Sequence, residues 1–190
     1  MLHSISPFPI QNLHRYVAWF DISRDEETLI PPLRSHIAII QFWHVVILFV
    51  ICLLYRRLQF AKCPPPKYLA WSYELLLLFH GALYAVEMIW TRLLTDTFLT
   101  VHHIASLWIF LLLRRDTGTC SIICLTPFLF HNLYHAVGSE QYAPSWILQV
   151  YNTSLVICCV YVMWERRKWL SIWMLVLTAN NILYATMRTI

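Results

Sequence analysis

The sequence is divided into six apolar stretches, each close to the length of a membrane-crossing helix, and few residues are left over for anything else. A transmembrane helix needs about 20 mostly apolar residues. Only 13% of the residues are charged, about half of the roughly 25% usual for soluble domains. We therefore expect an all-α integral membrane bundle of six transmembrane helices within residues 36–190, with spans at residues 37–55, 68–90, 98–113, 119–136, 146–164 and 169–187.

Residues 1–35 form a separate N-terminal segment in this interpretation. Apolar residues recur there at helical spacing, at Ile10, Leu13, Tyr16, Val17 and Phe20. His14 and Arg15 lie on the opposite side of such a helix. This pattern predicts an amphipathic helix that lies in the membrane interface. A helix that packs on a partner protein has the same pattern, so both alternatives stay open.

The composition excludes several other classes of function. Three glycines are too few for a glycine-rich phosphate loop, and the 14 lysines and arginines are scattered, so we expect no nucleic-acid partner. The six cysteines form no Cys-x-x-Cys pair, so we expect neither a structural zinc site nor a dithiol. We expect no cofactor.

The basic residues differ between the two sides of the predicted bundle. The connections after the first, third and fifth spans hold nine of the fourteen, at Arg56, Arg57, Lys62, Lys67, Arg114, Arg115, Arg166, Arg167 and Lys168. The positive-inside rule then places this side toward the cytosol or matrix and both termini on the other side. The membrane is that of the endoplasmic reticulum or the mitochondrial inner membrane, and the sequence does not decide between them.

Polar residues recur at one depth in the predicted bundle. Short connections make consecutive spans antiparallel neighbours, so residues equally far from a connection lie at the same height. By this estimate Glu87, His102, His131, Tyr151 with Asn152, and Asn180 or Asn181 share one level, and we take Asn181 as the candidate. His44 and His80 form a second pair. Ionisable residues within a bilayer are costly and mark functional sites by default.

Three interpretations of this polar level remain open. An imidazole held by Glu87 could act as a general base, with Tyr151 and the asparagines binding the head of a lipid. Two histidines and a carboxylate could hold a metal ion. Adjacent His102 and His103 diverge by about 100° on a helix and do not easily face one ion. This is the weakest of the three interpretations, and we expect no metal. In the third interpretation the polar groups pair with each other and fix the helix register.

Part of the sequence resembles the TLC-domain family of six-helix lipid-handling membrane proteins, which includes the ceramide synthases. The resemblance lies in Tyr84-Ala-Val-Glu87, in Asp96 followed by the pair His102-His103, in Gly118, and in Leu125-Thr126-Pro127-Phe128. It implies a lipid cavity among the helices and an acyl-transfer role for His102 and His103. It also implies cytosolic termini, the reverse of the charge count. The elongases of very long fatty acids also carry a paired histidine, in the motif His-x-x-His-His. Leu99 stands where the first histidine of that motif would be, so the resemblance to the elongases is weaker.

Two functions follow as hypotheses. The chain binds or modifies a long-chain lipid in a cavity between its helices, or it is a non-catalytic structural subunit of a respiratory or translocation complex. The second hypothesis predicts contacts with other subunits through tryptophans that lie away from the span ends, at Trp19, Trp43 and Trp108. Rings at span ends need no such explanation, because tryptophan favours the membrane interface.

Overall fold

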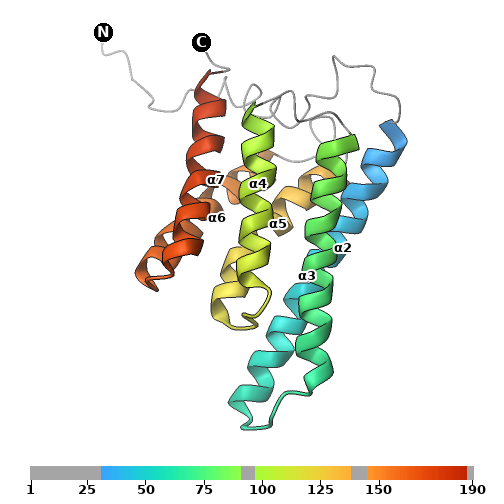
Figure 1. The fold of residues 1–190 in the computed structure, drawn as a ribbon, viewed down its shortest axis with the longest axis vertical. Coiled ribbons are helices and arrows are strands. Elements are labelled where there is room, and N and C mark those ends of the chain that lie inside the picture. The colour runs from blue at the N-terminus through green and yellow to red at the C-terminus, as the bar shows by residue number, and fades with distance from the viewer. Residues whose placement is uncertain (1–30, 91–96, 138–144, 188–190) are drawn as a thin grey trace.

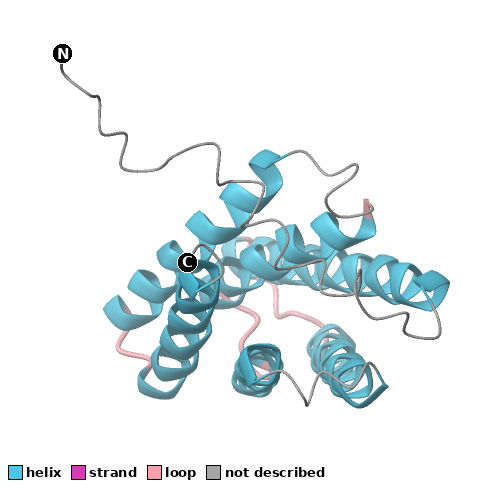
Figure 2. Cartoon of the chain, turned by 90° about the horizontal axis from the view of Figure 1, so that it is seen from above, coloured by secondary structure: helices cyan, strands magenta, loops and turns pink. Residues whose placement is uncertain are grey.

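The computed structural model describes residues 31–90, 97–137 and 145–187, and this part of the chain consists of helices joined by short connections (Figures 1 and 2). The all-α prediction is confirmed. The predicted interfacial helix lies outside the described residues. The described helices are α2 (Pro31–Phe60), α3 (Lys67–Trp90), α4 (Thr97–Leu113), α5 (Thr119–Ala136), α6 (Ser145–Trp164) and α7 (Lys168–Met187).

Three helical segments are long and apolar enough to cross a membrane, namely Ile39–Phe60, Lys67–Val86 and Trp146–Trp164. A fourth, Thr97–Leu113, is apolar but shorter. These segments are consistent with the prediction of a membrane protein. They coincide with the first, second and fifth of the predicted spans, and the shorter one coincides with the third.

The first helix continues beyond the predicted end of its span at Tyr55. Arginine is a good helix former, so the basic pair that follows Tyr55 ends the apolar stretch without ending the helix, and α2 reaches Phe60. There Lys62 takes a φ of 56°, and the N–H of Cys63 donates to the carbonyl of Leu58 at 3.0 Å. This is a Schellman turn, a usual helix end.

Helix α6 ends in the same way. Arg166 has a φ of 53°, and the N–H of Arg167 donates to the carbonyl of Val162 at 3.0 Å. Both left-handed positions are basic side chains rather than glycine. Two of the connections at the basic end of the bundle are therefore built from the same turn.

The helices do not pack in simple sequence order. Each one lies mainly along two neighbours, in the order α2, α3, α4, α7, α6, α5 and back to α2, which closes a ring. The expectation that every span packs beside the next is therefore wrong for α4 and α5. Their connection, Arg114 to Gly118, holds only two helix ends together, and the bodies diverge so that α4 packs on α7 and α5 on α2.

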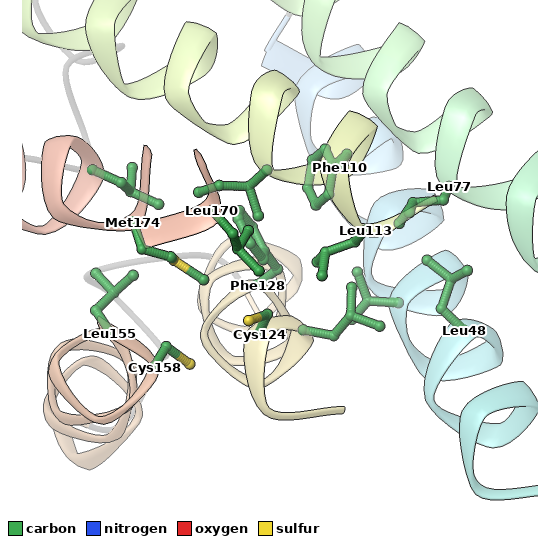
Figure 3. Close-up of a cluster of buried hydrophobic side chains, with 14 of the residues drawn as sticks. Leu48, Leu77, Phe110, Leu113, Cys124, Phe128, Leu155, Cys158, Leu170 and Met174 are labelled. Carbon is green, nitrogen blue, oxygen red and sulfur yellow. The ribbon is translucent and has the colours of Figure 1, made fainter. Parts of the chain in front are cut away.

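The inside of this ring is filled by one apolar cluster to which all six helices contribute (Figure 3). We call six of its members, one from each helix and each at most 2% exposed, the apolar layer: Leu48, Leu77, Phe110, Phe128, Leu155 and Met174. The rings of Phe110 and Phe128 lie 4.6 Å apart, centroid to centroid. Side chains therefore bridge the space between α4 and α5.

Helix α5 is the most enclosed of the six. Every residue from Thr119 to Ala136 is buried or half-buried, whereas α2, α3, α4, α6 and α7 all present large exposed apolar side chains. An enclosed helix touches protein rather than solvent or lipid. It can therefore carry polar residues such as His131 and Asn132 on more than one face.

A proline inside α5 is compensated by a neighbouring helix. Pro127 has no N–H to donate, so the carbonyl of Ile123, four residues earlier, loses its usual helical partner. The thiol of Cys158 on α6 donates to this carbonyl at 2.8 Å. Cys158 thus has a polar role in addition to its small apolar volume.

Candidate functional site

Two adjacent histidines in the second turn of α4 form the centre of the candidate site. His102 is 3% exposed and His103 is 7% exposed. Their rings lie 5.5 Å apart and point in different directions, as expected for consecutive helical residues. His102 faces α7 and α5, whereas His103 faces Tyr84 of α3, at 5.4 Å between ring centroids.

Each histidine is held through the same ring nitrogen. His103 Nδ1 lies 2.8 Å from the carbonyl oxygen of Leu99. A carbonyl only accepts hydrogen bonds, so Nδ1 carries the proton and Nε2 is the basic nitrogen of the neutral ring. His102 Nδ1 lies 3.1 Å from Asn181 Oδ1, which gives it the same tautomer.

The partner of His102 belongs to a short hydrogen-bonded chain. Asn181 Nδ2 donates to the hydroxyl oxygen of Tyr151 at 2.8 Å. The ring of Tyr151 lies 5.4 Å from that of His131, and His131 lies 5.4 Å from His102. These contacts join α4, α5, α6 and α7. We call the five residues involved the histidine layer: His102, His103, His131, Tyr151 and Asn181.

The structure brings together most, but not all, of the residues that were expected at this depth. Asn152 lies on the exposed face of α6, away from the histidine layer. The depth estimate selected the turn of α6 that carries Tyr151 and Asn152, and depth alone does not determine which of two consecutive residues faces inward. Glu87 lies in the last turn of α3, and its side chain is outside the described part of the chain.

The rings continue on both sides of the histidine layer. On one side His131 lies 4.8 Å from His135, near the end of α5. On the other side Tyr84 lies 5.3 Å from His80, which lies 6.1 Å from His44 on α2. The predicted pairing of His44 with His80 is therefore found.

Sequence reasoning missed three buried polar residues near the layer. Tyr84 and Tyr134 are each 1% exposed, as is Asn132. Tyr84 connects His80 with His103 through ring contacts. Its spacing was a signal that could have been used, because Tyr84 follows His80 by four residues and so shares its helix face.

The space below the histidine layer is packed. Phe110 lies 4.8 Å from His80 and 5.4 Å from Tyr84, between ring centroids, and it also contacts Phe128. Aromatic side chains therefore fill the middle of the ring at the level of Phe110 and Phe128, and the lipid cavity that the resemblance implied stays a prediction.

The layer combines groups that suit proton transfer and the binding of a polar head. Two imidazoles with a fixed tautomer offer basic nitrogens, and Tyr151 and Asn181 offer donors and acceptors within a largely apolar surrounding. Within the described residues, no group of three or more histidine, cysteine or acidic side chains is arranged to hold a metal ion. Comparisons with protein-family models, with curated proteins and with solved structures find no match to this chain.

Proposed function

We propose that this protein crosses the membrane six times and binds the polar head of a long-chain lipid at the histidine layer. Two features support six spans: the described chain is a series of six helices joined end to end, and most of them have an apolar outer face. Large exposed apolar side chains occur on α2, α3, α4, α6 and α7, such as Ile47, Leu75, Leu111, Ile157 and Leu175. In a bilayer these side chains contact lipid tails, and enclosed α5 does not need them.

The observation that carries the proposal is the pair of buried histidines with Nδ1 held by an acceptor. A histidine that serves only to fix helix register needs one partner. Here His102 is oriented by Asn181, and Asn181 is itself oriented by Tyr151. Orientation by a second and a third residue is typical of imidazoles that act as bases or bind a ligand.

The direction of the lipid chain follows from the packing below the layer. Phe110 and Phe128 fill the ring on the side of the basic turns. We infer that the head lies among His102, His131 and Tyr151, and that the acyl chain leaves sideways between helices or toward the end at which α5 finishes. A chain that leaves sideways enters the bilayer directly.

The same geometry supports an acyl-transfer step as the finer form of the proposal. An Nε2 of His102 or His103 takes the proton from a hydroxyl or amine nucleophile, which then attacks the carbonyl carbon of an acyl ester. The tetrahedral adduct collapses, the bond from the acyl carbon to the ester oxygen breaks, and the imidazolium gives its proton to the departing alcohol. A positioned general base contributes about 10²- to 10⁴-fold to a rate. If the protein catalyses such a transfer, His102→Ala and His103→Ala each lower the rate by about that factor and leave the helical fold intact.

Photocrosslinking tests lipid binding at this site. The full chain in lipid nanodiscs is exposed to a long-chain fatty acid that carries a diazirine close to its carboxyl end. Crosslinks are expected on α4 and α5, near His102 and His131, and His102→Leu should abolish them. Asn152→Leu is the matched control on the exposed face of α6 and should change nothing. Crosslinks confined to the outer apolar faces, and unchanged by His102→Leu, would contradict the proposal.

A specific observation favours the second candidate, a structural subunit. Trp43 is 57% exposed and lies four residues after Ile39, where the first apolar segment begins, so its ring is accessible to a partner subunit as well as to the membrane interface. Trp108 is 45% exposed, but it stacks on Trp173 of the same chain at 5.5 Å, so its position has an explanation within the protein. Trp19 is outside the described residues.

Gentle extraction from the native membrane separates the two candidates. The lipid proposal expects a monomer or self-oligomer that keeps a lipid. The subunit candidate expects co-purification of other membrane proteins and its loss in Trp43→Ala. Trp164→Ala is a suitable control, because Trp164 is 82% exposed and ends α6, where an interfacial ring is expected.

A further inference from the structure

A groove lies at the turn between α2 and α3, at the opposite end of the bundle from His135. Its volume is about 360 Å³, within the range of about 300–1,000 Å³ that is common for small-molecule sites. The lining is mostly apolar and contains one charged residue. It is formed by Leu54, Arg57, Leu58, Ala61, Pro66, Tyr68 and Leu69.

The charged residues in the segment that forms this groove all have one sign. Residues 54–69 include Arg56, Arg57, Lys62 and Lys67 and no acidic residue. Arg56 is engaged within the protein, because it donates to the hydroxyl of Thr119 and lies 5.2 Å from the centre of the Phe60 ring. Arg57 lines the groove, and among the described residues it has neither a hydrogen-bond partner nor an ion-pair partner for its guanidinium.

The groove lies where a bilayer would end. It joins the last turns of the apolar segment Ile39–Phe60 to the start of Lys67–Val86. Two exposed aromatic rings, Phe60 and Tyr68, lie at this level, as is usual for the membrane interface. Figure 1 shows the turn between α2 and α3 extending beyond the α4–α5 and α6–α7 turns at the same end of the bundle.

We propose that this groove binds one anionic phospholipid of the surrounding membrane. An acyl chain lies along Leu54, Leu58 and Leu69, and the phosphate pairs with Arg57. A guanidinium binds phosphate through two parallel hydrogen bonds, and Lys62 and Lys67 add positive charge beside it. The positive-inside rule places the basic connections on the side of the cytosol or matrix. Anionic lipids concentrate in the cytoplasmic leaflet. This site is separate from the histidine layer.

Native mass spectrometry of the full chain with defined lipids tests this site. The protein is titrated with phosphatidylglycerol and with phosphatidylcholine of the same acyl chains. We expect one phosphatidylglycerol to bind preferentially, and Arg57→Gln to lower that affinity about fivefold. Arg57→Lys should keep part of the preference. Arg115→Gln removes an equal charge from an exposed position at the same end of the bundle and outside the groove, so it should have little effect.

Further variants distinguish binding of the acyl chain from binding of the lipid head, and this groove from the histidine layer. Leu69→Trp fills the groove and should remove the preferential site without changing the helical content. His102→Leu should leave the phosphatidylglycerol preference unchanged, so this inference can hold even if lipid binding at the histidine layer fails. Equal losses in Arg57→Gln and Arg115→Gln would overturn the proposal, because charge alone would then explain binding. Displacement of the lipid by millimolar inorganic phosphate would overturn it too.

Discussion

The histidine layer and the apolar layer lie within about two helical turns of each other on α4 and α5, yet they are built in different ways. The apolar layer draws one side chain from each of the six helices, and each is at most 2% exposed. The histidine layer is joined instead by hydrogen bonds and ring contacts of its polar side chains, which come from four helices. Close packing therefore holds the bundle together, whereas the polar contacts orient a few groups. Four substitutions test this difference, in order of decreasing effect.

The largest loss of stability is expected in the apolar layer. Leu77 is fully buried on α3, and Leu77→Ala should lower the free energy of unfolding by about 2–5 kcal/mol, because a cavity remains where the side chain was. Leu75 is two residues away and 50% exposed, so Leu75→Ala is the matched control and should cost much less. Unfolding in mixed detergent micelles measures both. Similar losses in the two variants would remove the distinction between packed and outer faces.

The second substitution affects the contact that compensates Pro127. Cys158→Ala leaves the Ile123 carbonyl without a donor from α6, and an unsatisfied buried polar group costs about 1–3 kcal/mol. Cys158→Ser keeps a donor and should be close to the wild type. The neighbouring Cys159 is 7% exposed, and Cys159→Ala serves as the control for lost volume. The same unfolding measurement applies, and a Cys158→Ser variant as unstable as Cys158→Ala would contradict the polar role.

The third substitution breaks the hydrogen-bonded chain of the histidine layer. Asn181→Leu removes the partners of both His102 and Tyr151 and should cost about 1 kcal/mol, since hydrogen bonds between membrane helices contribute about 0.6–1.7 kcal/mol. Asn152→Leu changes the same residue type on the exposed face of α6 and should not destabilise the fold. A loss in Asn181→Leu as large as that in Leu77→Ala would mean that the polar contacts hold the bundle together.

The smallest effect is expected outside both layers, at the turn that ends α6. Arg166 has a φ of 53°, a left-handed conformation that is strained for a residue with a side chain. Arg166→Gly should stabilise the protein by about 0.5–1 kcal/mol, because glycine adopts this conformation without that strain. Arg167 follows it outside the helix without a left-handed φ and pairs with Asp116 at 3.1 Å, so Arg167→Gly relieves no strain and should not stabilise. Differential scanning calorimetry in detergent distinguishes the two variants.

Much of the fold could be predicted from the sequence, because hydropathy and connection length are local properties. The helix positions follow from the apolar stretches, except that α2 is longer than its stretch at both ends. It begins at Pro31, within the segment expected to be separate, and it continues to Phe60 because the charged pair after Tyr55 ends an apolar stretch and not a helix. The ring order could not be predicted in this way. Short connections fix which helix ends meet, but the packing of α4 on α7 and of α5 on α2 depends on side-chain fit along whole helices.

The candidate site was predicted in depth and only partly in direction. Counting residues from the connections brought His102 and His131 to one level with Asn180 or Asn181. The structure places Asn181 beside His102, whereas Asn180 donates to the carbonyl of Phe98. The same counting did not separate inward-facing Tyr151 from outward-facing Asn152. The direction of a side chain depends on how its helix is rotated in the bundle, and a nearly uniform apolar helix such as α6 gives little sign of its rotation.

Lipid occupancy with and without His102→Leu is the most direct test of the proposed role of the histidine layer. Native mass spectrometry of protein released from nanodiscs, combined with an unfolding measurement on the same samples, gives both quantities. In a Leu69→Trp background, in which the α2–α3 groove is filled, the protein should retain a long-chain lipid at the histidine layer. Adding His102→Leu should remove this lipid while the free energy of unfolding changes by no more than about 1–2 kcal/mol. Retention of the same lipid by the double variant would contradict a role of this layer in lipid binding.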